Sequence, residues 1–299
     1  MLLRILTLAA VMASTSAMHA VTRNIAPQNN SNVAVQNAVN ASVSGDIVYL
    51  QSGSHYFTGE VVLPSNKSGI VIRGQSGAIV RKASNSNISA FRIDGNGYTF
   101  DNIEIDGGLK PGNGVLCYGD SNTFTNCRFH HCGNAGILFH EANNNVVRGG
   151  AYNNNNGVGI SQWASSGGDI IGQSSSSRLQ ANQNGLEGLT IDGLSHNCLV
   201  QYVTMNSNKG GVGNIGIDQA NGSWVYDSTC NSHLNRSGVT FQNNLGPCDG
   251  PRIWRCTLNN NNDWPIQVRN VNYGITNYSF ANNTQTGNVR GNGVFWGAE

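Results

Sequence analysis

Short segments that alternate apolar and polar residues recur along this chain at a regular interval. Each copy has apolar residues at its first and third positions, and most copies follow a glycine. The copies are residues 91–94, 115–118, 137–140, 158–161, 189–192, 215–218, 239–242 and 266–269. Their fourth residues lie between 21 positions (His140 to Ser161) and 31 positions (Ser161 to Asp192) apart. Period-two alternation predicts β-strands, and strands repeated in units of about 20–30 residues predict a solenoid of stacked coils.

The segments around these copies predict the rest of each coil and one end of the stack. A second strand is expected in most coils, as in residues 123–129, 199–205 and 252–258, followed by asparagine-rich turns such as 153–156 and 259–262. Residues 32–43 predict a helix with Ser31 as N-cap and with Val35, Ala38, Val39 and Ser42 on one face. Such a helix would cover the open end of the solenoid. Residues 44–57 then predict a strand, a glycine turn and a second strand.

Composition and the N-terminus narrow the class of protein. The 299 residues are 38% hydrophobic and 11% charged, with a net charge of +1, which excludes a disordered chain and leaves no basic surface for nucleic acid. Residues 1–20 have the pattern of a signal peptide, with Arg4 before the apolar residues 5–12, and are too short to span a bilayer. We expect residues 21–299 to form one secreted domain, a monomer that binds neither nucleic acid nor a membrane.

Seven cysteines fit the oxidising compartment that secretion implies. Cys127 with Cys132, and Cys248 with Cys256, are close enough in sequence to form local disulfides. The sequence does not determine the pairing, and none of the cysteines has the paired spacing of a zinc site.

The order of a capping helix, the strand and turn SGDIVYLQSG, and glycine- and asparagine-rich coils resembles the pectate-lyase-like right-handed β-helix superfamily. The resemblance extends from residue 25 to the end of the chain. It implies an all-β fold, a single-stranded right-handed parallel β-helix with a short N-terminal capping helix. Polysaccharide lyases, polygalacturonases and mannuronan epimerases belong to this superfamily, and the shared features specify the fold far more than the chemistry.

Two columns of side chains are expected to point outward from the repeated strands, because alternate residues of a strand face opposite sides. The second positions hold one charged residue, and the fourth positions hold four together with a histidine and a tyrosine. The second column is Arg92, Leu116, Leu138, Gly159, Thr190, Gly216, Thr240 and Gln267. The fourth column is Asp94, Tyr118, His140, Ser161, Asp192, Asp218, Gln242 and Arg269. Clustered titratable groups on one stripe favour a functional cleft over an ordinary polar surface.

The chemistry of that stripe points to carbohydrate. Asp192 and Asp218 are expected about 5 Å apart on neighbouring coils, where mutual repulsion raises one pKa and suits it to general-acid catalysis. Arg269 is expected to bind the carboxylate of an acidic sugar. The order Asp192, Asp218, Arg269 resembles the order of such residues in polygalacturonases. Gln242 occupies the position at which that resemblance would imply a histidine.

Eliminative cleavage would use other members of the same column. Tyr118 and His140 on neighbouring coils are a candidate base and acid, and residues 136–141 are faintly similar to the Asp-Pro-His-Glu motif of mannuronan epimerases, from which only His140 carries over. A surface histidine without catalytic duty is the alternative for His140. Tyr118 and Trp163 offer flat surfaces for sugar rings, and Gln242 and Asp94 complete the candidate substrate-binding residues.

The sequence assigns no residues to a metal site. Calcium is the one cofactor for which it offers candidate ligands. Asp192 and Asp218 are one candidate pair of ligands. A second acidic group is expected to be ordinary solvated acids rather than a calcium site. It consists of Asp94, Asp101, Glu104 and Asp106.

The leading hypothesis is a secreted carbohydrate-active enzyme, a polysaccharide lyase that cleaves an acidic, uronate-containing glycan by β-elimination. An inverting glycoside hydrolase is the next alternative, and a C5-epimerase the third. A noncatalytic glycan-binding or adhesive β-helix, or a β-helix recruited to small-molecule chemistry, remains open as well.

Overall fold

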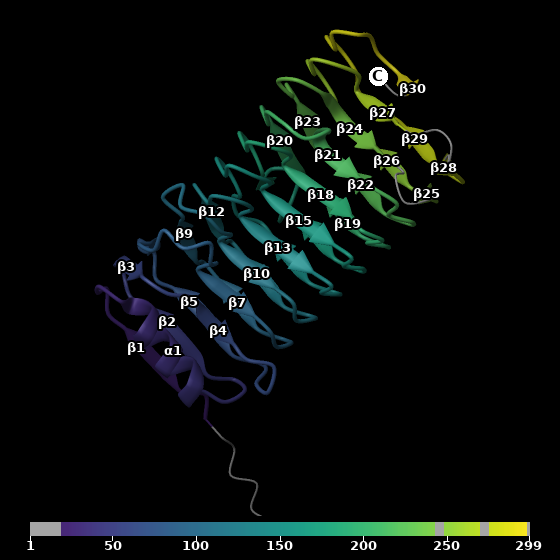
Figure 1. Cartoon of the computed structure of the whole chain (residues 1–299). Helices are drawn as coiled ribbons and strands as arrows, with labels where there is room; N and C mark the ends of the chain where they lie inside the picture. The colour runs from purple at the N-terminus through teal and green to yellow at the C-terminus, as the bar shows by residue number, and fades with distance from the viewer. Residues whose placement is uncertain (1–18, 243–247, 270–274, 298–299) are drawn as a thin grey trace, which may run out of the picture.

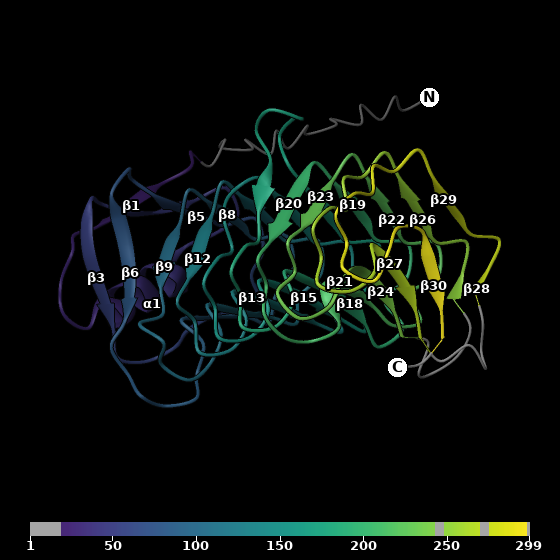
Figure 2. The same cartoon turned by 90° about the horizontal axis from the view of Figure 1, so that it is seen from above.

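Parallel strands stack coil upon coil into one elongated solenoid (Figures 1 and 2). The computed structural model describes residues 19–242, 248–269 and 275–297. The predicted signal peptide lies almost wholly outside the described residues. No helix among them is long and apolar enough to cross a membrane.

Two long parallel sheets form two sides of the solenoid. The 11-stranded sheet contains β1 (Thr22–Ile25), β2 (Ile47–Leu50), β5 (Val71–Gly74), β8 (Thr99–Asp101), β11 (Thr123–Thr125), β14 (Val146–Arg148), β16 (Asp169–Ile171), β19 (Leu199–Gln201), β22 (Trp224–Tyr226), β26 (Arg252–Trp254) and β29 (Ser279–Ala281). The 10-stranded sheet contains β4 (Val61–Leu63), β7 (Phe91–Ile93), β10 (Val115–Cys117), β13 (Ile137–His140), β15 (Ile160–Trp163), β18 (Leu189–Asp192), β21 (Gly213–Ile217), β24 (Ser237–Phe241), β27 (Ile266–Val268) and β30 (Val294–Trp296). The predicted parallel β-helix is therefore confirmed.

The third side consists of shorter sheets. One contains β3 (Gly53–Phe57), β6 (Ala78–Lys82), β9 (Glu104–Asp106) and β12 (Arg128–His130). The other contains β17 (Leu179–Gln180), β20 (Val203–Asn206) and β23 (Thr229–Asn231). A further pair, β25 (Cys248–Asp249) with β28 (Ile275–Thr276), lies at the opposite corner, between the 10-stranded and the 11-stranded sheet.

The expected second strand of each coil is wrong in detail, because it is two strands separated by a sharp corner. Residues 123–129 divide into β11 and β12 around Asn126, whose φ is 53°. Residues 199–205 divide likewise around Tyr202, and β26 ends before Arg255, each also with a φ of 53°. The left-handed residue shifts the alternation by one position. Phe124 is buried before Asn126, whereas Cys127 and Phe129 are buried after it, so a single strand with unbroken alternation cannot span these residues.

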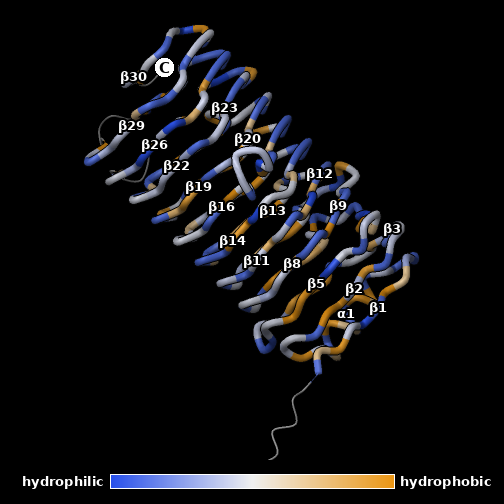
Figure 3. Tube along the Cα trace, turned by 180° about the vertical axis from the view of Figure 1, so that it is seen from behind, coloured by the Kyte–Doolittle hydropathy of each residue, from blue (hydrophilic) through white to orange (hydrophobic). Residues whose placement is uncertain are grey.

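Inward-facing side chains fill the solenoid and stack along its axis. Phe91, Phe100, Phe124 and Phe139 are fully buried, and their ring centroids follow one another at 5.2, 5.0 and 5.7 Å. Burying a side chain of this size contributes about 1.5–3 kcal/mol. Seen from behind, the coils near α1 and β2 are more hydrophobic than the later ones (Figure 3).

The helix α1 (Ser31–Ala41) packs over the N-terminal end of the stack against β1 to β4. Val35 and Val39 are fully buried, which confirms the predicted inner face. Ser31 is wrong as N-cap, because Asn30 precedes the helix and Ser31 is its first residue, with Oγ donating to the Gln28 carbonyl at 2.7 Å.

All seven cysteines are free and buried, so the expected local disulfides are wrong. All of them except Cys132 belong to the hydrophobic core. Burial raises the pKa of Cys127 and Cys132 to about 12.

A ladder of buried asparagines runs inside the asparagine-rich turns. Asn184 Oδ1 accepts from the backbone N–H of Asn155 at 3.0 Å, and Asn208 Oδ1 accepts from that of Asn184 at 2.9 Å. Asn208 Nδ2 donates to Asn214 Oδ1 at 2.8 Å. The first two bonds join successive coils and satisfy backbone groups that would otherwise be buried without partners, whereas the third links two side chains within one coil. We name Asn155, Asn184, Asn208 and Asn214 the inner asparagine ladder.

Candidate active site

The fourth column of outward side chains lies on the 10-stranded sheet, at or just beyond the end of each strand. At Asp94, Tyr118, Asp218, Gln242 and Arg269, the backbone N–H donates to the third-position carbonyl of the preceding coil, at 2.7–2.9 Å. These bonds keep neighbouring fourth positions about 4.8 Å apart. Asp192, Asp218 and Arg269 therefore share one exterior column, with Gln242 between the last two.

One member of the predicted column is wrong. β15 pairs Trp163 with His140 on one side and with Asp192 on the other, while Ser161 pairs with Leu138 and Thr190. Trp163 thus occupies the fourth column, and Ser161 belongs to the second in place of Gly159. The strand begins at Ile160 rather than Val158, which places Gln162 inward, where it is 1% exposed.

Three carboxylates converge on a pocket at the middle of this column. Its lining includes Glu187, Thr190, Asp192, Asp218 and Gln242. The free volume is about 60 Å³, enough for a few water-sized groups.

Burial and mutual repulsion favour the protonated form of two of these acids. Burial raises the pKa of Asp192, and the nearby Asp218 raises it further, although Asp192 Oδ1 accepts from the Gly193 N–H at 2.6 Å. Burial also raises the pKa of Glu187. The Val212 N–H donates to Glu187 Oε1 at 2.8 Å, and this bond lowers the pKa by less than burial raises it. A proton donor and an acceptor carboxylate can therefore share this pocket.

Sequence reasoning missed Glu187. It lies in the turn two residues before β18 rather than at any position of the repeated strand, so neither outward column contains it. The signal that could have found it is the glycine-flanked turn itself, since loops carried on a rigid scaffold often hold functional groups.

The first half of the column is aromatic. The ring centroids of Tyr118 and His140 are 5.5 Å apart, and those of His140 and Trp163 are 6.5 Å apart with the planes 16° from parallel. Tyr118 is 44% exposed and Trp163 is 46% exposed. We name Tyr118, His140 and Trp163 the aromatic strip; it leads directly to Asp192.

The two ends of the column are less closely tied to the pocket. Arg269 lies two coils beyond Asp218, and its Nε donates to Gln267 Oε1 at 3.1 Å. Asp94 makes a two-pronged ion pair with Arg92, with Nε–Oδ1 at 3.0 Å and Nη2–Oδ2 at 2.9 Å. Asp94 therefore lines a separate hollow beside Glu60 and Tyr118.

The second acidic group does not form one site, because its members belong to three different sheets. Asp94 follows β7, Asp101 ends β8, and Glu104 and Asp106 lie on β9. Asp101 pairs with Arg73 at 2.8 Å and Asp106 with Arg81 at 2.6 Å. The four acids therefore cannot share a single calcium ion, which was the disfavoured alternative for this group.

Comparisons with known proteins agree with this architecture. A family model described as a right-handed β-helix region matches residues 23–172, half of the chain. No curated protein matches the sequence.

Several solved structures are similar in fold. ORF18 of Geobacillus virus E2 has a TM-score of 0.73 and 15% identity, covering 93% of this chain and 61% of that one. The A-module of the Azotobacter vinelandii mannuronan C-5 epimerase AlgE4 has a TM-score of 0.62 and 13% identity, covering 91% of each chain. The catalytic unit of a Streptomyces thermodiastaticus α-1,3-glucanase has a TM-score of 0.54 and 12% identity, covering 94% of this chain and 68% of that one. This chain thus spans about three fifths of the viral protein, and these likenesses show a shared fold.

Proposed function

This chain belongs to the right-handed β-helix family, and from that premise we propose that it is a secreted enzyme that hydrolyses the glycosidic bonds of a polysaccharide. The observation that carries the proposal is the convergence of Glu187, Asp192 and Asp218 on one pocket. Two of the solved structures that share the fold are named as a glucanase and a mannuronan epimerase, which supports the carbohydrate class of substrate.

Glycoside hydrolysis needs one carboxylic acid that is protonated and one carboxylate that is ionised. Asp192 is the proposed general acid, because its pKa is raised and it reaches the pocket from the end of β18. Its proton passes to the glycosidic oxygen, which leaves as a hydroxyl group. Asp218 is the proposed base; it takes a proton from the water molecule whose oxygen bonds to the anomeric carbon.

Glu187 has a supporting role in this scheme. It is 7% exposed, and burial raises its pKa. A raised pKa reduces the negative charge that Glu187 adds beside Asp192 and Asp218.

The aromatic strip is the proposed binding surface for the sugar chain. Tyr118 and Trp163 present half-exposed rings on the same column as the acids, and amphipathic rings contribute both apolar contact and hydrogen bonding. Gln242 lines the far side of the pocket and is placed to hydrogen-bond a sugar hydroxyl.

β-Elimination of a uronate glycan is the second candidate, supported by the 5.5 Å approach of the Tyr118 and His140 rings. The pocket acids weigh against it, because a polyanionic substrate would meet like charges there. Arg269, the cation of the same column, lies two coils beyond Asp218.

The test is to incubate the full chain with neutral glucans, galacturonan and mannuronan and to follow two products. New reducing ends without ultraviolet absorbance indicate hydrolysis, whereas absorbance from a new carbon–carbon double bond indicates elimination. We expect Asp192→Asn and Asp218→Asn each to lower kcat by about 10²–10⁴, the range for losing a general acid or base.

Asp169→Asn is the matched control. Asp169 is also an outward, half-buried aspartate with a raised pKa, but it lies on β16 of the 11-stranded sheet. Turnover that survives both pocket substitutions would refute the proposed site, and elimination products that depend on His140 would favour the second candidate.

A further inference from the structure

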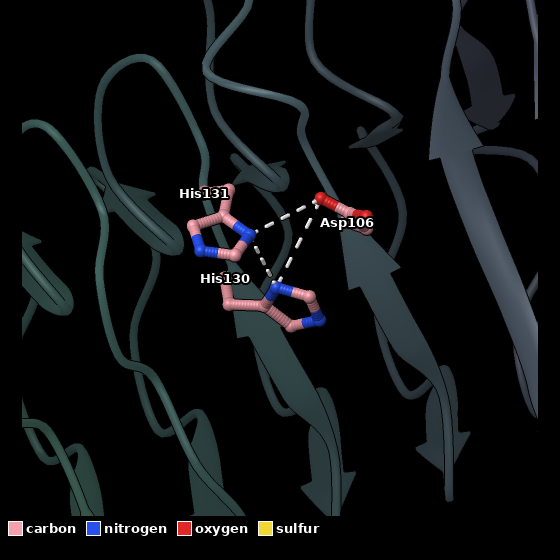
Figure 4. A group of neighbouring side chains, drawn as sticks. All are labelled: Asp106, His130 and His131. Atoms are coloured by element: carbon pink, nitrogen blue, oxygen red, sulfur yellow. Dashed lines mark hydrogen bonds and ion pairs between the residues drawn. The ribbon is translucent and has the colours of Figure 1, made fainter.

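A second cluster of titratable groups lies away from the pocket, on the third side of the solenoid. Asp106 ends β9, His130 ends β12, and His131 follows it (Figure 4). His130 Nδ1 is 2.9 Å from His131 Nδ1, and Asp106 Oδ1 is 3.9 Å and 3.4 Å from these two atoms. Asp106 and His130 are register partners on adjacent coils, so the cluster bridges two turns of the helix.

We propose that Asp106, His130 and His131 bind a divalent transition-metal ion, with Zn²⁺ the best fit. The triangle with edges of 2.9, 3.4 and 3.9 Å has its circumcentre about 2.0 Å from each corner, which is the bond length of Zn²⁺ to imidazole nitrogen and carboxylate oxygen. That point lies in the plane of the three atoms, so tetrahedral coordination with a fourth ligand requires side-chain shifts on the order of half an ångström. Two imidazoles favour zinc, nickel or copper over calcium or magnesium.

Glu104 supplies the hydrogen bond that a metal-binding histidine usually makes. Its Oε1 lies 2.9 Å from His130 Nε2, and the two side chains are on neighbouring strands. The carboxylate favours the tautomer of His130 with its proton on Nε2, which leaves Nδ1 as the nitrogen that can bind a metal ion. A carboxylate behind a histidine ligand fixes the tautomer and raises its basicity.

The remaining surroundings are compatible with an ion. Asp106 Oδ2 accepts from Arg81 Nη1 at 2.6 Å, and the Gly108 N–H donates to Oδ1 at 3.2 Å, so the carboxylate is held in place and Oδ1 keeps a lone pair. The His131 side chain is 46% exposed. Its Nε2 can therefore carry the ring proton, and solvent can supply a fourth ligand.

Such an ion would link the coil of β9 to the coil of β12. This role is independent of the carboxylate pocket, which lies on the 10-stranded sheet. A ligand that binds only the folded state stabilises it in proportion to its concentration.

The test is a competition titration of the full chain with ZnCl₂ against a chromophoric chelator, together with thermal melts and Co²⁺ absorption spectra. We expect one equivalent of Zn²⁺ to bind and to raise Tm. Glu104→Gln should weaken binding by about 10–100-fold, the usual loss for such a partner, and His131→Asn should weaken it further. Asparagine suits position 131 because His131 has a φ of 53°, a conformation that asparagine tolerates.

His196→Asn is the matched control, since His196 is a half-buried histidine in the turn after β18, far along the chain. The His196→Asn variant should bind Zn²⁺ with the same affinity as the unmodified protein and show the same Tm shift. No binding by the unmodified chain, or binding that His131→Asn leaves unchanged while circular dichroism shows a native fold, would overturn the proposal.

Discussion

Replacing Asn184 by alanine should destabilise the protein strongly, although Asn184 is a polar residue that does not line the carboxylate pocket. Its side chain is fully buried. Oδ1 accepts from Asn155 N at 3.0 Å and Asn155 Nδ2 at 3.1 Å, while Nδ2 donates to the Tyr152 carbonyl and to Asn208 Oδ1, both at 3.1 Å. Alanine removes all four bonds.

The magnitude follows from what the truncation leaves behind. A net intramolecular hydrogen bond contributes about 1 kcal/mol, and a buried group left without a partner costs about 1–3 kcal/mol. Asn155 N–H loses the acceptor given above, and Asn155 Nδ2 keeps only the Phe129 carbonyl at 3.3 Å. We expect the free energy of unfolding to fall by about 3 kcal/mol, or about 1 M in urea midpoint for a slope near 3 kcal/mol/M.

The assay is urea unfolding followed by circular dichroism, with two comparison variants. Asn182→Ala removes a half-exposed asparagine that accepts from Asn206 N at 2.8 Å and donates to Gln180 Oε1 at 2.8 Å. Water can replace both bonds, so the loss should stay below about 1 kcal/mol. Asn184→Leu fills the volume without restoring the bonds and should be nearly as harmful as alanine. Equal midpoints for Asn184→Ala and Asn182→Ala, or full rescue by leucine, would refute the reasoning.

Two further predictions concern buried titratable groups, the Asp192 carboxyl and the cysteine thiols. Because the pKa of Asp192 is raised above 3.8 in the folded state, stability falls as pH rises from 3.8 through the raised value. Asp192→Asn should therefore raise the urea midpoint at neutral pH, with the gain shrinking toward pH 3.8; a constant gain at all pH values would contradict this. The seven buried thiols should react with a thiol reagent only in denaturant, and reducing agent should leave Tm unchanged; fast labelling of the native protein would contradict this.

The strand repeat predicted the fold because period-two alternation survives every coil, but it could not settle registers that differ by two residues. Residues 158–161 (Val-Gly-Ile-Ser) have apolar side chains at the first and third positions, whereas residues 160–163 (Ile-Ser-Gln-Trp) have Gln162 at the third. The pattern therefore favoured the first register. The structure buries Gln162, and a shift of two leaves every side chain on the same face. The sequence therefore assigned the outward face of this strand correctly, but it placed Ser161 rather than Trp163 in the fourth column.

The residues that sequence reasoning missed are those whose position depends on turns. Glu187 reaches the pocket from a turn. His131 follows β12 and itself has a left-handed backbone conformation, which turns its side chain toward Asp106. Neither has a fixed place in the alternation. Pairing of carboxylates across coils was predictable because strand spacing fixes it, whereas the approach of a turn residue depends on the turn conformation.

The inner asparagine ladder contributes to stability and also bears on the candidate active site, because it reaches the strands that carry the pocket acids. Asn184 stands three residues before Glu187, and Asn208 Nδ2 donates to Asn214 Oδ1 on β21, the strand that leads to Asp218. The Asn214 carbonyl in turn accepts from the Gly188 N–H at 2.9 Å. The ladder therefore supports, from inside the solenoid, the strands whose backbone hydrogen bonds set the spacing of Asp192 and Asp218. Outward residues of the column can change without loss of the fold, whereas a change in the ladder must alter stability and pocket geometry together.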